Sequence, residues 1–94
     1  MKKVAVVVRQ PEIYYEALRS ALGCLLEDHQ VSYVVLDREI DPDEAFRDNL
    51  GFLEEMEGRS YSNHPANADK YGFTHLSWPE IGKLLREQEV IIPF

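Results

Sequence analysis

One unbroken apolar run, Val4–Val8, constrains the fold of this chain more than any other segment. Four of its five residues are valine, a β-branched residue that favours extended strands. A strand that is apolar at every position, rather than at alternate ones, is typical of a parallel sheet covered by helices on both faces. The run therefore predicts a central strand of an α/β fold.

A helical repeat follows this strand. From Tyr14 to Leu25, apolar residues recur at i, i+3, i+4, i+7, i+8 and i+11, and Pro11 suits a first helical turn. Further residues widen the stripe at about 100° per residue: Ile13, Ser20 and Cys24 on one side, Tyr15 and Leu26 on the other. The excess width predicts a second contact surface, such as another subunit.

The rest of the chain continues the alternation of strands and helices. We expect a second strand over 31–37, then a helix with Asp41 as its N-cap and Gly58 at its end. Short strands are expected over 59–63 and 73–76.

A proline and a capping box complete this pattern. His64-Pro65 interrupts the third strand, because proline cannot donate a hydrogen bond to a sheet, and a short helix follows. Ser77-Trp78-Pro79-Glu80 is a capping box that opens a helix to about Glu87, and 90–94 forms the last strand. The chain is thus predicted to be one α/β domain, residues 1–94, with α/β/α layers and a mainly parallel sheet of about five strands.

Charge and cysteine content exclude several function classes. The net charge is −7 and the ten basic residues are scattered, which argues against nucleic acid or an anionic membrane as a partner. A single cysteine excludes an intrachain disulfide and a zinc site of several thiolates. The apolar run ends at Arg9, too early for a signal peptide, and no segment is long enough to span a membrane, so we expect a cytoplasmic protein. No phosphate-binding glycine motif or histidine cluster points to a cofactor or a metal.

The carboxyl ends of the strands are the expected place for a ligand crevice. The polar residues and the tyrosine at these ends form the candidate crevice: Arg9, Gln10, Tyr14, Asp37, Arg38, Asn63 and His64. His64 has the chemistry of a general base or hydrogen-bond donor. A histidine before a proline in a loop is more often solvated or capping, and this alternative stays open.

Cys24 is the only candidate thiol. Reactive thiolates occur at helix N-termini or beside cations. Cys24 instead falls well inside the predicted helix, towards the negative end of the helix dipole, and borders the apolar stripe. The sequence therefore predicts a small buried or interfacial side chain rather than a nucleophile.

The segment from Glu16 to Val31 resembles the first helix and turn of the DsrE-like family, which includes the DsrE/DsrF/DsrH and TusB/TusC/TusD sulfur-relay proteins. The resemblance rests on Arg19-Ser20-Ala21-Leu22-Gly23 and on a turn containing His29 before the second strand. It implies a five-stranded sheet, trimers or hexamers, other sulfur-relay subunits as partners, and transfer of persulfide sulfur through a cysteine in the loop after the third strand. The corresponding stretch here, Tyr61–Pro65, has no thiol.

The resemblance, together with the missing cysteine in the loop after the third strand, favours a non-catalytic, self-associating protein. It is predicted to be a DsrE-like subunit or a small-ligand-binding protein linked to sulfur transfer. Two alternatives involve chemistry: a sulfur carrier that uses Cys24, or an enzyme that uses His64. A third alternative is an interaction module unrelated to sulfur.

Overall fold

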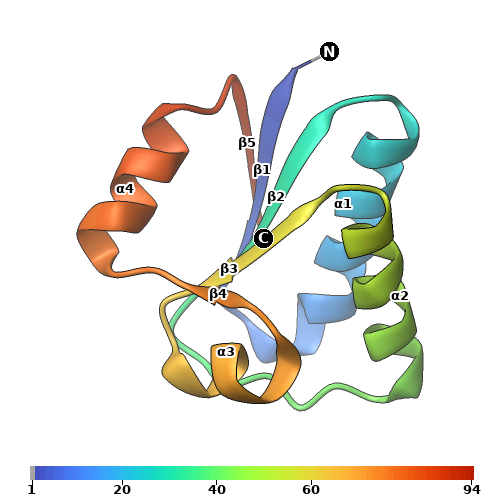
Figure 1. Cartoon of the computed structure of the whole chain (residues 1–94), viewed down its shortest axis with the longest axis vertical. Helices are drawn as coiled ribbons and strands as arrows, with labels where there is room; N and C mark the ends of the chain where they lie inside the picture. The colour runs from blue at the N-terminus through green and yellow to red at the C-terminus, as the bar shows by residue number, and fades with distance from the viewer. Residues whose placement is uncertain (1) are drawn as a thin grey trace.

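A parallel sheet of five strands forms the centre of the structure, a computed structural model that describes residues 2–94. The strand order is β4-β3-β2-β1-β5, and every neighbouring pair is parallel (Figure 1). The strands are β1 (Lys3–Val8), β2 (Gln30–Val35), β3 (Arg59–Ser62), β4 (Thr74–His75) and β5 (Val90–Pro93). The predicted α/β class with a mainly parallel sheet is confirmed.

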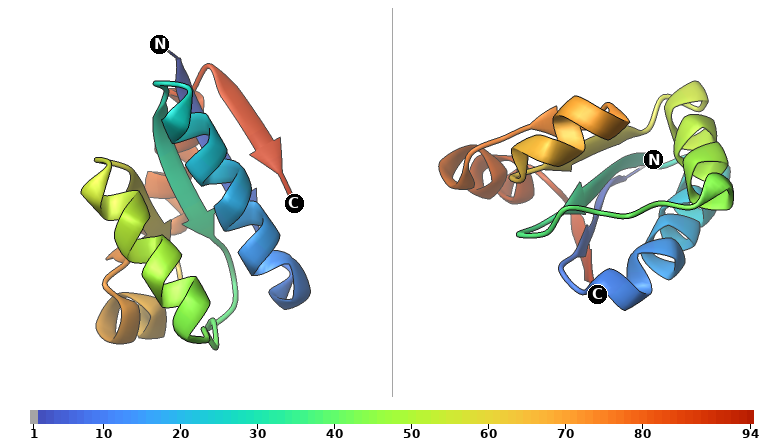
Figure 2. Two further views of the ribbon diagram at one scale, coloured as in Figure 1. Left: turned by 90° about the vertical axis from the view of Figure 1, so that its right-hand side faces the viewer. Right: turned by 90° about the horizontal axis from the view of Figure 1, so that it is seen from below.

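The connecting helices lie on both faces of this sheet. They are η1 (Pro11–Ile13), α1 (Tyr14–Leu26), α2 (Glu44–Glu55), α3 (Pro65–Tyr71) and α4 (Trp78–Arg86). Helices α1 and α2 cover one face, here called the α1 face, and α4 lies on the other, the α4 face (Figure 2). The chain steps from β1 to β2 to β3 in one direction and then returns to place β5 on the other side of β1. A right-handed crossover in the reverse direction must pass over the opposite face, which explains the position of α4.

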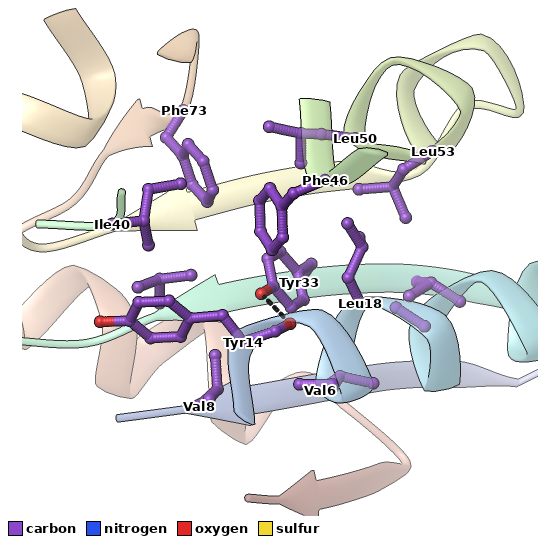
Figure 3. Packing of buried hydrophobic residues seen from close by; sticks show 14 of the residues in the cluster. Val6, Val8, Tyr14, Leu18, Tyr33, Ile40, Phe46, Leu50, Leu53 and Phe73 are labelled. Carbon is purple, nitrogen blue, oxygen red and sulfur yellow. Dashed lines mark hydrogen bonds between the residues drawn. The ribbon is translucent and has the colours of Figure 1, made fainter. Parts of the chain in front are cut away.

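The main hydrophobic core fills the α1 face. Val4, Val6 and Val8 of β1 pack there against fully buried Leu18 of α1. The Tyr33 hydroxyl donates a hydrogen bond of 2.9 Å to the Tyr14 carbonyl oxygen (Figure 3). Alternate residues of β1 thus point into this core, while Ala5 and Val7 point to the α4 face.

The α4 face has a smaller core. Ile81 of α4 packs with Val34 and Leu36 of the sheet, and half-buried Leu84 and Leu85 border them. This single helix leaves large apolar side chains accessible. Trp78 at its start is 53% exposed and Ile91 of β5 is 46% exposed.

The start of α2 differs from the sequence prediction. The N-cap is Asp43, not Asp41, and its carboxylate accepts a hydrogen bond of 2.8 Å from the Phe46 N–H. Ile40 is buried and its N–H donates to Asn67 Oδ1, which keeps this segment out of the helix. Pro42 also favours an extended backbone at Asp41, which likewise keeps Asp41 out of the helix.

The predicted helix end at Gly58 is also wrong. Helix α2 ends at Glu55, and Glu57 has the left-handed backbone, with φ 68°. Gly58 serves close packing instead, because a Cβ there would lie 2.8 Å from Leu53 Cγ. The second strand likewise ends at Val35, before Asp37 leaves the extended region with φ 70°.

Candidate functional site

Polar side chains link the carboxyl ends of β1, β2 and β3. Arg9 Nε donates to Asp37 Oδ2 at 3.0 Å, and the Asp37 N–H donates to Asn63 Oδ1 at 2.7 Å. Asn63 Nδ2 returns a hydrogen bond of 3.2 Å to Asp37 Oδ1. The structure therefore brings together Arg9, Asp37 and Asn63, three of the predicted crevice residues.

Asn67 lies beneath this cluster and is fully buried. Its Nδ2 donates to the Arg38 carbonyl at 2.8 Å and to Ser62 Oγ at 3.0 Å. Its Oδ1 accepts from the Ile40 N–H at 2.9 Å. Sequence reasoning missed Asn67, since nothing in the polar stretch after Asn63 distinguishes a buried asparagine from a solvated one.

His64 acts as a cap in this structure. Its Nδ1 accepts a hydrogen bond of 3.2 Å from the Ala66 N–H at the start of α3, next to Pro65 in the first turn. Its backbone N–H donates to Ser62 Oγ at 3.1 Å. Ser62 is fully buried and also bonds Asn67, so this serine and histidine do not form a nucleophile–base pair.

The other predicted crevice residues contribute less. Gln10 and Arg38 are exposed, and their backbone carbonyls accept hydrogen bonds from the Ile13 N–H and Asn67 Nδ2. Tyr14 is buried, and its hydroxyl has no partner among the described residues. Figure 3 shows this hydroxyl directed away from Tyr33. Burial raises the pKa of Tyr14, which keeps the phenol neutral.

Asp37 is the charged centre of the cluster. The hydrogen bond from Arg9, with that from Asn63 and the charges of Arg9 and Arg38, lowers the pKa of this carboxyl group against a small opposing effect of burial. The Arg9 side chain is 64% exposed and that of Asp37 is 32% exposed. The cluster thus connects the carboxyl ends of β1, β2 and β3 by hydrogen bonds, and its charged pair, Arg9–Asp37, lies at the surface.

Cys24 lies away from this cluster. It is half-buried in the last turns of α1 and packs against the main core. Burial, together with the negative charge of Glu27, raises the pKa of its thiol. A raised pKa lowers the thiolate fraction at neutral pH, so the site does not activate this cysteine.

A groove lies at the opposite edge of the sheet, where sequence reasoning placed no site. This amino-edge groove has a volume of about 1150 Å³ and runs along the amino ends of β1, β2 and β3. Lys3, Ser32 and Arg59 of the strands line it, as do His29 and Glu57 of the loops that follow α1 and α2. In the sequence, His29 falls in a turn before the second strand and is assigned no site, because the carboxyl-end rule points to the other edge of the sheet.

Among residues 2–94, no group of His, Cys, Asp and Glu side chains is placed to hold a metal ion. Within the same range, no helix combines the length and apolar character needed to cross a membrane.

Comparison of the chain with family models, curated proteins and solved structures gave no match. The DsrE-like resemblance therefore stays a prediction.

Proposed function

We propose that this chain is a non-catalytic subunit of the DsrE-like type, which associates with a second copy of itself through the free edge of β5. The observation that carries the proposal is this edge strand, Val90–Pro93, which pairs with β1 on one side only. The function is then performed by an assembly, and the chain supplies a structural interface rather than a reactive group.

The backbone of β5 has hydrogen-bonding groups available at this edge. The Glu89 N–H donates to the Lys3 carbonyl of β1 at 2.8 Å. Alternate residues of a strand donate to the same neighbour, so the N–H groups of Val90 and Ile92 face the free edge. Natural proteins protect such edges with charged residues, prolines or short strands; β5 contains no charged residue, and its one proline, Pro93, is at the last position. The other edge strand, β4, has only two residues and offers little for pairing.

Apolar side chains flank the β5 edge on both faces of the sheet. Ile91 is 46% exposed on the α4 face. On the α1 face, Ile92 and Phe94 are only half-buried, because no helix covers β5 beyond α1. A second copy is the occupant that fits, since two identical strands pair antiparallel about a two-fold axis with every group matched.

A two-fold contact also bears on the oligomers that the resemblance implies. A hexamer that combines two-fold and three-fold axes contains such a contact, whereas a cyclic trimer does not. We therefore favour a dimer or a hexamer built from dimers over a trimer.

The polar residues support a role without covalent chemistry. The loop after β3 contains no cysteine, and His64 and Ser62 in it are engaged in hydrogen bonds within the chain. The raised pKa of Cys24 disfavours a sulfur carrier. By analogy with the DsrE-like family, we assign the assembly to sulfur transfer, with other relay subunits as its partners.

Sedimentation velocity over a wide concentration range tests the interface. Wild type is expected to sediment as an oligomer, and Ile91→Lys as a monomer, because lysine would be brought close to its copy across the two-fold axis. Phe52→Lys is the matched control: Phe52 is 45% exposed, almost the same fraction as Ile91, but lies on α2. A monomeric wild type, or equal loss of assembly in both variants, refutes the proposal.

Intact mass after incubation with a persulfide donor tests the absence of sulfur chemistry. We expect no mass increase of one sulfur atom on folded wild type, and labelling of Cys24 only after denaturation. Rapid labelling of the folded protein that disappears in Cys24→Ser would instead make the chain a carrier.

A further inference from the structure

The amino-edge groove has a floor of polar and cationic side chains on the α4 face. Ser32 pairs with Arg59 on β3, and Lys3 pairs with Gln30 on β2, so these side chains share one face of the sheet. Helix α4 packs over Val34 and Leu36, nearer the carboxyl ends, and does not cover them. The floor therefore remains open to the groove.

A serine hydroxyl and two cationic side chains line this groove. Ser32 is only 8% exposed, and its side chain lines the groove. Lys3 and Arg59 are exposed, and the ion pairs of the described chain, Arg9–Asp37 and Lys70–Glu39, do not involve them. The floor thus offers a hydroxyl and two positive charges to a ligand.

His29 adds a donor at the side of the groove. Its Nδ1 accepts a hydrogen bond of 3.1 Å from the Lys2 N–H. In the neutral ring the proton is then on Nε2, which is a donor.

The rim of the groove carries the opposite charge. Asp28, Glu54, Glu55 and Glu57 line it from the loops and helix ends after α1 and α2. None of them is within ion-pair distance of Lys3 or Arg59 in the described chain. Opposite charges thus stand in one groove without neutralising each other. Carboxylates on the rim repel polyanions such as nucleotides. The cations of the floor therefore do not make this groove a site for a polyanion.

We infer that the amino-edge groove binds a small dipolar ligand, such as an amino acid or short peptide, with its carboxylate on the Lys3–Arg59 floor and its cationic group at the acidic rim. A ligand of this kind matches both signs of charge and supplies an acceptor to Ser32. The inference does not rest on the self-association of β5, because the groove contains no residue of that strand.

Titration followed by backbone amide chemical shifts tests this inference. The probe is ε-aminocaproate, with caproate as the anion-only analogue and hexylamine as the cation-only analogue. We expect saturable shifts at Ser32, Arg59 and Glu57 with ε-aminocaproate, and binding weaker by about tenfold or more with either analogue. Equal binding of caproate would show a simple anion site, and no saturable shift would show no site; either result overturns the inference.

Charge-removing variants locate the two ends of the ligand. Arg59→Gln and Glu57→Gln should each weaken binding of ε-aminocaproate by about tenfold, as expected for loss of one charge-assisted contact. Arg19→Gln and Glu16→Gln are matched controls, because both residues are exposed on α1 outside the groove. Equal weakening by the controls would reveal a non-specific charge effect and overturn the inference. Sedimentation of the same samples reports separately on the β5 interface.

Discussion

The Asn67 side chain joins the loop after β2, at Arg38 and Ile40, to the end of β3, at Ser62. Truncation in Asn67→Ala leaves these buried partners without a hydrogen bond, and we expect a loss of about 2–4 kcal/mol in the free energy of unfolding. Urea denaturation measures this loss. Asp69→Ala, an exposed change on the same helix, should stay within about 0.5 kcal/mol. A similar small effect at Asn67 would mean that the network contributes little to stability.

The Arg9–Asp37 pair predicts an acid-dependent stability. The pKa of Asp37 is lowered in the folded state, so its contribution is present above the ordinary value of about 3.9 and is lost as pH falls through the folded pKa. Because both side chains are partly exposed, we expect wild type to exceed Asp37→Asn by only about 0.5–1 kcal/mol at neutral pH. This difference in unfolding free energy should vanish in strong acid. A difference that is constant with pH contradicts the ion-pair account.

Two helix ends share an unusual local structure. After α1 and α2, Asp28 and Glu57 adopt left-handed backbones, with φ 66° and 68°, where glycine is the common residue. Both acids also lie at the negative ends of helix dipoles, which is unfavourable. Both acids line the acidic rim of the groove.

Adjacent substitutions at the end of α2 should have opposite effects. Glu57→Gly relieves the left-handed strain and should stabilise the protein by about 0.5–1 kcal/mol. Gly58→Ala places a Cβ 2.8 Å from Leu53 Cγ and 3.0 Å from Leu25 Cδ1, and should destabilise it by about 1–3 kcal/mol. Thermal and urea unfolding of both variants measure the signs. Destabilisation by Glu57→Gly would argue against the strain.

The sequence predicted β1, α1 and α4 well, because they have a continuous apolar run, a clear apolar period and a capping box with a proline, respectively. It failed at boundaries that tertiary contacts determine. Asp43 rather than Asp41 caps α2, since Ile40 is held by Asn67, a residue distant in sequence. The role of Gly58 comes from its close packing against Leu53, which no local pattern reveals.

The candidate site was predictable only in part. Arg9, Asp37 and Asn63 follow parallel strands, so their meeting at one edge follows from topology. The buried position of Asn67 depends on hydrogen bonds to Arg38, Ile40 and Ser62, and the groove beside Ser32 depends on how far α4 extends over the sheet. Packing determines the length and tilt of α4, and the spacing of apolar residues in the sequence does not reveal them.

At the scale of the whole molecule, the two faces of the sheet are unequal. Two long helices cover the α1 face, while α4 alone covers the other and β5 forms an edge without charged residues. Each copy also carries a net charge of −7, which opposes association. Salt screens this repulsion, so added sodium chloride should strengthen oligomer formation in sedimentation experiments. Dissociation by salt would point to an interface held by ion pairs instead.

Amide hydrogen exchange at β5 tests the central claim most directly. In a concentrated sample the N–H groups of Val90 and Ile92 should exchange slowly, because a second copy pairs with them, and in a dilute sample they should exchange fast. The Ile91 N–H faces β1 and should stay protected in both, which provides an internal reference. Fast exchange of Val90 and Ile92 at every concentration, with Ile91 still protected, would contradict self-association through this edge.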